Sequence, residues 1–271
     1  MNIRLSGTTI LTRKIQIPLS LVPLLLALTP LQKTDFTWSH GGIVRGSLDE
    51  PVLALVFTGD EFGDGTAHIR DVLRRQGIKG SFFFTGRFYR NPDFADDIRA
   101  LAADGHYLGA HSDQHLLYCS WEKRDSLLVT RDEFVKDIFD NYTEMARFGV
   151  KREEAPFFMP AYEWYNDQIS AWTNELGLTL INYSPGTRSH ADYTTPDLEH
   201  YVASNAIMES IESYEARDPS GLNGFILLSH VGTAPERTDK FYLHLDELIT
   251  VLRMRGYTFQ RIDELLNEPE R

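Results

Sequence analysis

The sequence predicts an α/β fold in which parallel strands close, or nearly close, into a barrel. From Pro51 onward, short apolar runs alternate with amphipathic segments, and no linker, repeat or low-complexity break interrupts them. Strands that alternate with helices form parallel sheets with right-handed crossovers. A length of 271 residues favours a barrel over an open sheet, and one domain over two.

Seven strands and six helices are expected in alternation. Continuous apolar runs rich in β-branched and aromatic residues indicate buried strands, and apolar residues three and four apart indicate helices that pack on the sheet. The expected strands are 52–58, 81–85, the short run that ends at Ala110, 156–160, 178–184, 225–230 and 257–262. The expected helices lie at 66–76, 94–101, 134–145, 169–176, 198–211 and 245–252, most of them followed by a glycine that suits a helix C-terminus.

The N-terminal region resembles a secretory signal, because basic residues precede the apolar run 15–31. Three prolines interrupt that run, which makes it a poor integral membrane span, and an apolar arm packed on the domain is the alternative. We therefore expect an exported protein, periplasmic or extracellular, with a cytoplasmic location left open. The expected organisation is 1–31 as signal peptide or arm, 32–50 as an extension, and 51–267 as the main domain.

Charge and cysteine content restrict the partners. The net charge of −12 and a pI near 5.2 argue against nucleic acid or an anionic membrane surface, whereas neutral glycans remain possible. Cys119 is the single cysteine, so no internal disulfide is expected. No feature indicates an obligate protein partner.

Reactive side chains follow the ends of four predicted strands. They are Asp60, Glu61 and Asp64 after the first strand, His111 and His115 after the third, Tyr162 and Glu163 after the fourth, and His230 at the end of the sixth. The carboxyl ends of barrel strands share one rim, where catalytic groups sit. The sequence therefore predicts one site at this rim.

The pair His111 and His115, with an upstream carboxylate, has the composition of a catalytic metal site. Such an ion lowers the pKa of bound water and polarises a carbonyl, so hydrolysis of an ester or amide is the expected chemistry. The alternative is a pair of exposed helix histidines, or one ligand beside a hydrogen-bonded bystander.

These residues resemble the NodB-type polysaccharide deacetylases, carbohydrate esterase family 4. The run HSDQH at 111–115, after GHYLGA, is similar to that family's motif H-[ST]-x-x-H. Residues 57–61 (FTGDE) loosely match TFDDG, 81–86 (SFFFTG) match the TFF strand, 159–163 (MPAYE) match RPPYG, and 228–230 (LSH) match the last motif. The resemblance covers 51–267. It implies a distorted (β/α)7 barrel, a divalent ion that is zinc or else cobalt, manganese or nickel, and removal of N- or O-linked acetyl groups from a carbohydrate.

The resemblance also implies roles. His111, His115 and Asp60 fall on the metal ligands, and His230 falls on the general acid. The candidate substrate contacts are Tyr162, Trp164 and Leu228, the first two because aromatic rings on rim loops can stack on sugars. If the metal-binding carboxylate is located by strand register alone, it falls one residue before Asp60, on Gly59, which has no side chain to ligate. A rival match places the Asp-Gly pair of the family motif TFDDG at Asp64 and Gly65.

Two residues depart from the family motifs at the positions of the general base and its partner. The family's catalytic aspartate and its arginine partner are replaced by Gly59 and Met159. Asp64 or Glu163 is then the candidate base, although Asp64 also suits a helix cap and Glu163 a surface carboxylate. The rival function is a degenerate member that binds metal or glycan without turnover.

Overall fold

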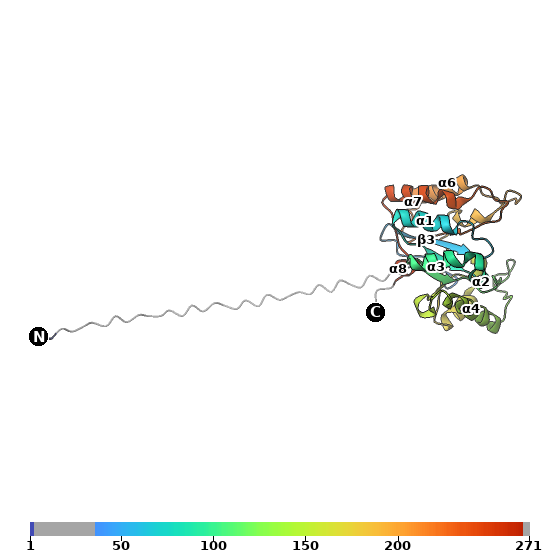
Figure 1. Cartoon of the computed structure of the whole chain (residues 1–271), viewed down its shortest axis with the longest axis horizontal. Coiled ribbons are helices and arrows are strands. Elements are labelled where there is room, and N and C mark those ends of the chain that lie inside the picture. Colours follow the sequence, from blue (N-terminus) through green and yellow to red (C-terminus); the bar gives the residue numbers. More distant parts are fainter. Residues whose placement is uncertain (3–35, 268–271) are drawn as a thin grey trace. The chain divides into compact units, whose positions relative to one another are not determined.

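A computed structural model of the chain describes residues 1–2 and 36–267. Its centre is a curled sheet of seven strands, all paired in parallel, in the order β7-β6-β5-β4-β3-β8 with β9 against the start of β3 (Figure 1). The strands are β3 (Val52–Gly59), β4 (Ser81–Phe84), β5 (Tyr107–Ala110), β6 (Phe157–Phe158), β7 (Thr179–Leu180), β8 (Ile226–His230) and β9 (Thr258–Phe259). The predicted distorted (β/α)7 barrel is confirmed. The expected signal peptide or arm at 1–31 lies outside the described residues, apart from residues 1–2.

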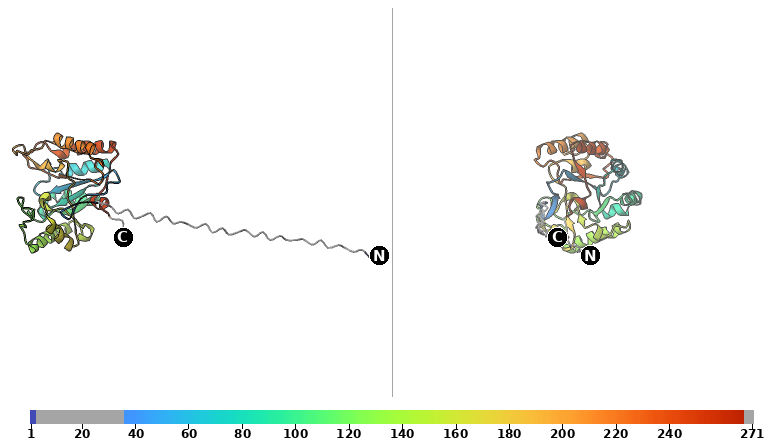
Figure 2. Two further views of the ribbon diagram at one scale, coloured as in Figure 1. Left: turned by 180° about the vertical axis from the view of Figure 1, so that it is seen from behind. Right: turned by 90° about the vertical axis from the view of Figure 1, so that its left-hand side faces the viewer.

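Helices cover the outside of this sheet (Figure 2). They are α1 (Thr66–Gln76), α2 (Gly86–Arg90), α3 (Ala95–Ala103), α4 (Arg131–Ala146), α5 (Asp167–Glu175), α6 (Ser204–Arg217), α7 (Leu245–Met254) and α8 (Ile262–Leu265). The six predicted helices are all present, while α2 and α8 are additions. Within the described residues, no helix has the length and apolar character needed to cross a membrane.

Three strands and one helix are shorter than expected. The runs 156–160, 178–184 and 257–262 pair over only two residues each, and α6 begins at Ser204 rather than near 198. Tertiary bonds explain the late start of α6: the guanidinium of Arg237 donates to the carbonyl of Val202, and the Asp239 carboxylate accepts from the Ser204 amide. These bonds hold the preceding backbone outside the helix.

Side-chain pattern accounts for the main elements. All four residues of β4 and all four of β5 are buried, as expected for strands covered on both faces. Helix α1 ends at Gly77, whose φ of 65° allows a left-handed turn, and the next amide, Ile78, donates to the carbonyl of Leu73.

A hairpin outside the predicted domain contributes to the barrel. Its strands are β1 (Thr37–Ser39) and β2 (Gly42–Arg45), and β2 lies between the edges formed by β7 and β8. The carbonyl of Ile43 accepts from the Asn182 amide, and the Gly46 amide donates to Gly224. Buried Arg45 donates to the carbonyls of Asn223 and Gly221, so it braces this closure away from the predicted site.

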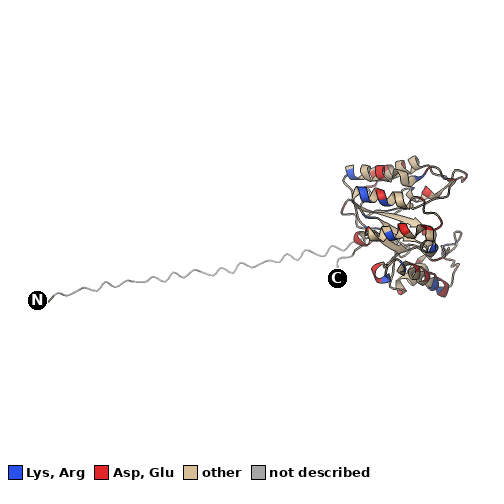
Figure 3. Ribbon diagram, viewed as in Figure 1, with Lys and Arg blue, Asp and Glu red and all other residues tan. Residues whose placement is uncertain are grey.

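Acidic and basic side chains are interspersed along the helices seen in Figure 3. Many of them form local pairs, such as Lys136 with Asp140 within α4. Such solvated pairs contribute little to stability.

Candidate active site

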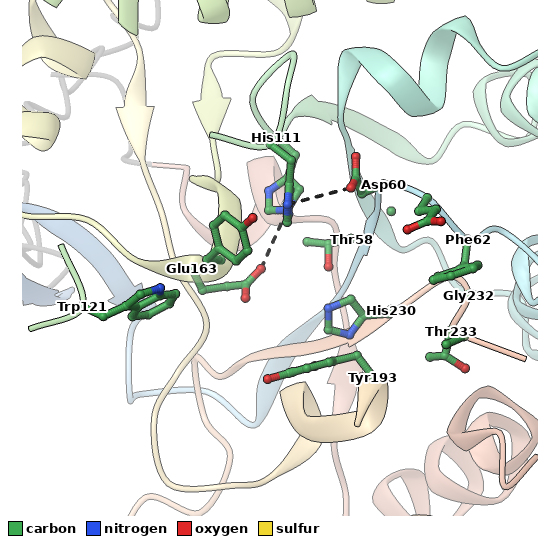
Figure 4. A pocket seen from close by; sticks show the side chains of 15 residues that line it. Thr58, Asp60, Phe62, His111, Trp121, Glu163, Tyr193, His230, Gly232 and Thr233 are labelled. Carbon is green, nitrogen blue, oxygen red and sulfur yellow. Dashed lines mark ion pairs between the residues drawn. The ribbon is translucent and has the colours of Figure 1, made fainter. Parts of the chain in front are cut away.

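Seven of the eight predicted strand-end residues, all except Asp64, line one cavity of about 450 Å³ (Figure 4). Asp60 follows β3, His111 and His115 follow β5, Glu163 follows β6, and His230 ends β8. All five line the cavity. The remaining lining residues are Thr58, Gly59, Glu61, Phe62, Trp121, Tyr162, Tyr193, Gly232, Thr233 and Ala234.

The two histidines after β5 are held in the neutral form. The ring Nδ1 of His111 lies 2.9 Å from the carbonyl oxygen of Met159, so it donates and leaves Nε2 with a lone pair. Burial lowers the pKa of His111 well below its usual value and lowers the pKa of His115 to about 4. The ring centroids lie 5.4 Å apart. Neutral imidazoles at this spacing suit two ligands of one divalent ion.

Asp60, the predicted third ligand, already accepts hydrogen bonds from two neighbouring side chains. Its Oδ1 accepts from the Thr85 hydroxyl at 2.8 Å and from Arg87 Nε at 3.1 Å, and its Oδ2 accepts from Arg87 Nη2 at 2.5 Å. The same Oδ2 lies 3.8 Å from Nδ1 of His115. Among residues 36–267, no three His, Cys, Asp or Glu side chains are arranged so as to hold a metal ion. The histidines fit such a group, whereas the carboxylate of Asp60 already spends much of its acceptor capacity on Thr85 and Arg87.

His230 is paired with a carboxylate that sequence reasoning missed. Asp192, in the short helix η4 (Ser189–Tyr193), accepts from the His230 ring Nδ1 at 2.6 Å and from its backbone amide at 2.9 Å. Burial lowers the pKa of His230, but the charge and hydrogen bond of Asp192 outweigh it, so this pKa lies above its ordinary value. No local motif marks Asp192, because it lies in a short 3-10 helix 38 residues before its partner.

Glu163 faces the cavity from a strained turn. Tyr162 and Glu163 both have left-handed backbones, with φ of 59° and 51°, which is uncommon for residues other than glycine. The Glu163 carboxylate lies 3.8 Å from Nε2 of His111 and is 14% exposed. Burial raises the pKa of Glu163 to about 7.

Asp64 lies outside the set of lining residues. Its carboxylate accepts from the Thr233 amide at 3.0 Å and the Tyr242 hydroxyl at 2.8 Å, and it pairs with Lys240 at 3.1 Å. These bonds tie the loop after β3 to the loop after β8. It does not cap α1, whose start has no side-chain cap.

Of the expected substrate contacts, only Tyr162 lines the cavity. Leu228 is fully buried inside β8, and Trp164 has the Arg124 guanidinium 3.4 Å from its ring centre. Trp164 supports Trp121, whose ring centre lies 5.0 Å away and whose side chain is 55% exposed.

The chain matches the family model described as polysaccharide deacetylase over residues 45–181, and it belongs to that family. The predicted membership, as a divergent NodB-type member, is confirmed. The peptidoglycan-N-acetylmuramic acid deacetylase PdaA of Bacillus subtilis is 24% identical over 225 residues, which are 83% of this chain and 75% of that protein. A chitin deacetylase of Arthroderma benhamiae is 24% identical over 86% of this chain and 57% of its own length.

Two solved structures share the fold. The structure of PdaA, described as a family 4 carbohydrate esterase, superposes with a TM-score of 0.66 at 22% identity, over 85% of this chain and 87% of that one. BA3943 of Bacillus anthracis, described as a CE4 family pseudoenzyme, superposes with a TM-score of 0.65 at 17% identity, over 85% and 70%. The fold is therefore common to proteins described as enzymes and as pseudoenzymes.

Proposed function

We propose that this chain is a hydrolase that removes acetyl groups, linked through nitrogen or oxygen, from a carbohydrate. The observation that carries this proposal is the pair formed by Asp192 and His230 at the cavity wall. A histidine held at Nδ1 by a buried carboxylate presents Nε2 to a ligand in a fixed orientation. A protein that only bound glycans would have no use for this proton-transfer pair.

His230 acts as the general acid and donates its proton to the departing amine or alcohol. Glu163 is the better base, because it lines the cavity, whereas both oxygens of Asp64 are engaged in the neighbouring loop. A carboxylate with a pKa of about 7 combines basicity with a large ionised fraction at neutral pH. Glu163 thus stands in for the catalytic aspartate that Gly59 replaces.

We propose further that His111, His115 and Asp60 hold a divalent ion, zinc or else cobalt, manganese or nickel. Such an ion would supply a water of lowered pKa and would polarise the acetyl carbonyl. Two neutral imidazoles support the proposal, while the bond between Asp60 and Arg87 opposes it. Arg87 then competes with the ion for the carboxylate of Asp60.

The second candidate is a member of the family that binds glycan or metal without turnover. Gly59 and Met159 both depart from the family's base and its arginine partner, and one structure of the same fold is described as a pseudoenzyme. The sugar in either case is expected to contact the exposed rings of Trp121, Tyr162 and Tyr193 at the cavity edge.

Acetate release separates the two candidates. The substrates are acetylated chitooligosaccharide, acetylated xylan and peptidoglycan fragments, each assayed with added metal and again after chelation. We expect release that His230→Ala abolishes, and metal retention that His111→Ala abolishes. The exposed His244, which pairs with Glu247, provides the control variant His244→Ala. No release from any substrate favours the binder, and stoichiometric metal in His111→Ala refutes the ligand assignment.

We also propose that the protein acts outside the cytoplasm, on the strength of the N-terminal sequence pattern. Separation of cell fractions, with the full chain compared against a variant that starts at residue 32, tests this. A full chain found only with cytoplasmic markers would refute it.

A further inference from the structure

Thr58 contributes an unpaired hydroxyl to the wall of the cavity. It is the second-last residue of β3, it lines the cavity, and it is 1% exposed. Its Oγ1 has no hydrogen-bond partner among the described residues. Buried polar atoms nearly always have a partner, because an unpaired one loses its hydration without compensation.

Other buried threonines show the usual arrangement. The Thr66 hydroxyl donates to the Gly63 carbonyl at 2.8 Å, and the Thr173 hydroxyl donates to the Ile169 carbonyl at 2.8 Å. Thr85 donates to Asp60. Thr58 differs from these three because its hydroxyl has no bond, and it differs from the other unpaired buried groups, such as Tyr89 and His106, because it lines the cavity.

Strand register places Thr58 beside the general acid. Thr58 and His230 are register partners in the parallel pairing of β3 with β8, so their side chains project from the same face of the sheet. Figure 4 shows the hydroxyl of Thr58 directed toward the His230 ring. Since Asp192 holds Nδ1, the other ring nitrogen, Nε2, is the one left for a ligand.

We propose that Thr58 Oγ1 and His230 Nε2 together bind the atom that joins the acetyl group to the sugar. This inference rests on the proposed function. The hydroxyl accepts from the N–H of an N-acetyl group or donates to the oxygen of an O-acetyl group. The water oxygen bonds to the acetyl carbon as the bond from that carbon to the sugar atom breaks. The proton of the water passes to Glu163, and the proton of His230 passes to the leaving atom. Thr58 keeps that atom in line with the acid.

The test compares Thr58→Val, which replaces the hydroxyl by a methyl group of similar size, with Thr58→Ser, which keeps it. We expect Thr58→Val to lower kcat/KM for acetate release about tenfold, the loss of one hydrogen bond, and Thr58→Ser to stay near the wild type. Thermal stability of Thr58→Val should be equal to the wild type or higher, since no native bond is lost. The control Thr66→Val should show the reverse, a lower Tm with unchanged kcat/KM, because its hydroxyl is bonded within the chain.

Binding measurements distinguish failure of this inference from failure of the proposed function. Affinities for acetylated chitooligosaccharide and for its deacetylated counterpart are measured by calorimetry for wild type and Thr58→Val. If the wild type binds without releasing acetate, a roughly tenfold weaker affinity of Thr58→Val for the acetylated oligomer alone still supports the contact. Equal rates and equal affinities in wild type and Thr58→Val overturn it, as does a loss that Thr58→Ser shares. A wild type that neither binds nor cleaves overturns both proposals.

Discussion

Replacement of Asp192 by asparagine tests the proposed general acid, His230, most directly. Asp192 is 1% exposed and holds His230 through two bonds, one to the ring and one to the backbone amide. Asparagine keeps the size but offers one acceptor and one donor. When its oxygen accepts from the backbone amide, its NH2 group faces Nδ1, and protonation of that nitrogen becomes unfavourable.

The expected magnitude follows from the bond that is lost. A hydrogen bond to a charged group contributes about 1.5–3 kcal/mol, so acetate release by Asp192→Asn should fall about 10- to 150-fold. The pKa of His230 should also fall, because Asp192 makes the largest contribution that raises it against the effect of burial. The alkaline limb of the pH–rate profile should therefore move to lower pH.

Stability should depend on pH in a defined direction. Because the folded-state pKa of His230 is raised, its pairing with Asp192 stabilises the fold fully below the unfolded pKa of about 6.5 and is lost as pH rises through the folded pKa. In urea unfolding, Asp192→Asn should lose more free energy of unfolding relative to the wild type at pH 6 than at pH 9.

The matched control is Asp104→Asn. Asp104 pairs with Arg70 at 2.6 Å, and an arginine keeps its charge between pH 6 and pH 9. The free energy of unfolding that Asp104→Asn loses should therefore be the same at both pH values. If Asp192→Asn shows no pH-dependent deficit and keeps wild-type release, the assignment of Asp192 and His230 as the proton-donating pair is wrong.

Three further predictions concern the base and the metal ligands. A Cβ at Gly59 would lie 2.7 Å from a Val231 methyl group, so Gly59→Asp should destabilise the fold by about 1–3 kcal/mol, and Val231→Ala in the same chain should recover part of this in urea unfolding. Equal stability of Gly59→Asp and wild type would contradict the packing argument. Because the pKa of Glu163 is raised, the free energy of unfolding should fall as pH rises from 4.5 through about 7. Glu163→Gln should remove that fall, and it should also remove the acidic limb of the pH–rate profile for acetate release. An unchanged pH–rate profile would eliminate Glu163 as the base. Arg87→Met should free Asp60 and raise zinc affinity in calorimetry, whereas an unchanged or weaker affinity would show that Arg87 does not compete with the ion for Asp60.

Short-range sequence patterns predict most strands and helices of this molecule, because they show which residues of each segment are buried. Continuous apolar runs marked β3, β4, β5 and β8, and alternation with helices made their parallel pairing and shared rim predictable. Strand order alone predicts that His111, His115 and Glu163 share one site, and all three line the cavity.

Other features depend on contacts between distant segments. Hairpin β1–β2 closes the sheet through bonds to residues more than 130 positions away, and its own seven strand residues carry no sign of that role. Asp192 binds His230 from the short helix η4. Arg87 forms an ion pair with Asp60, and Lys240 forms one with Asp64. The physical reason is the same in each case. A hydrophobic period records which face of an element is buried, whereas the partner of a polar side chain depends on which other chain segments surround it once the barrel has closed.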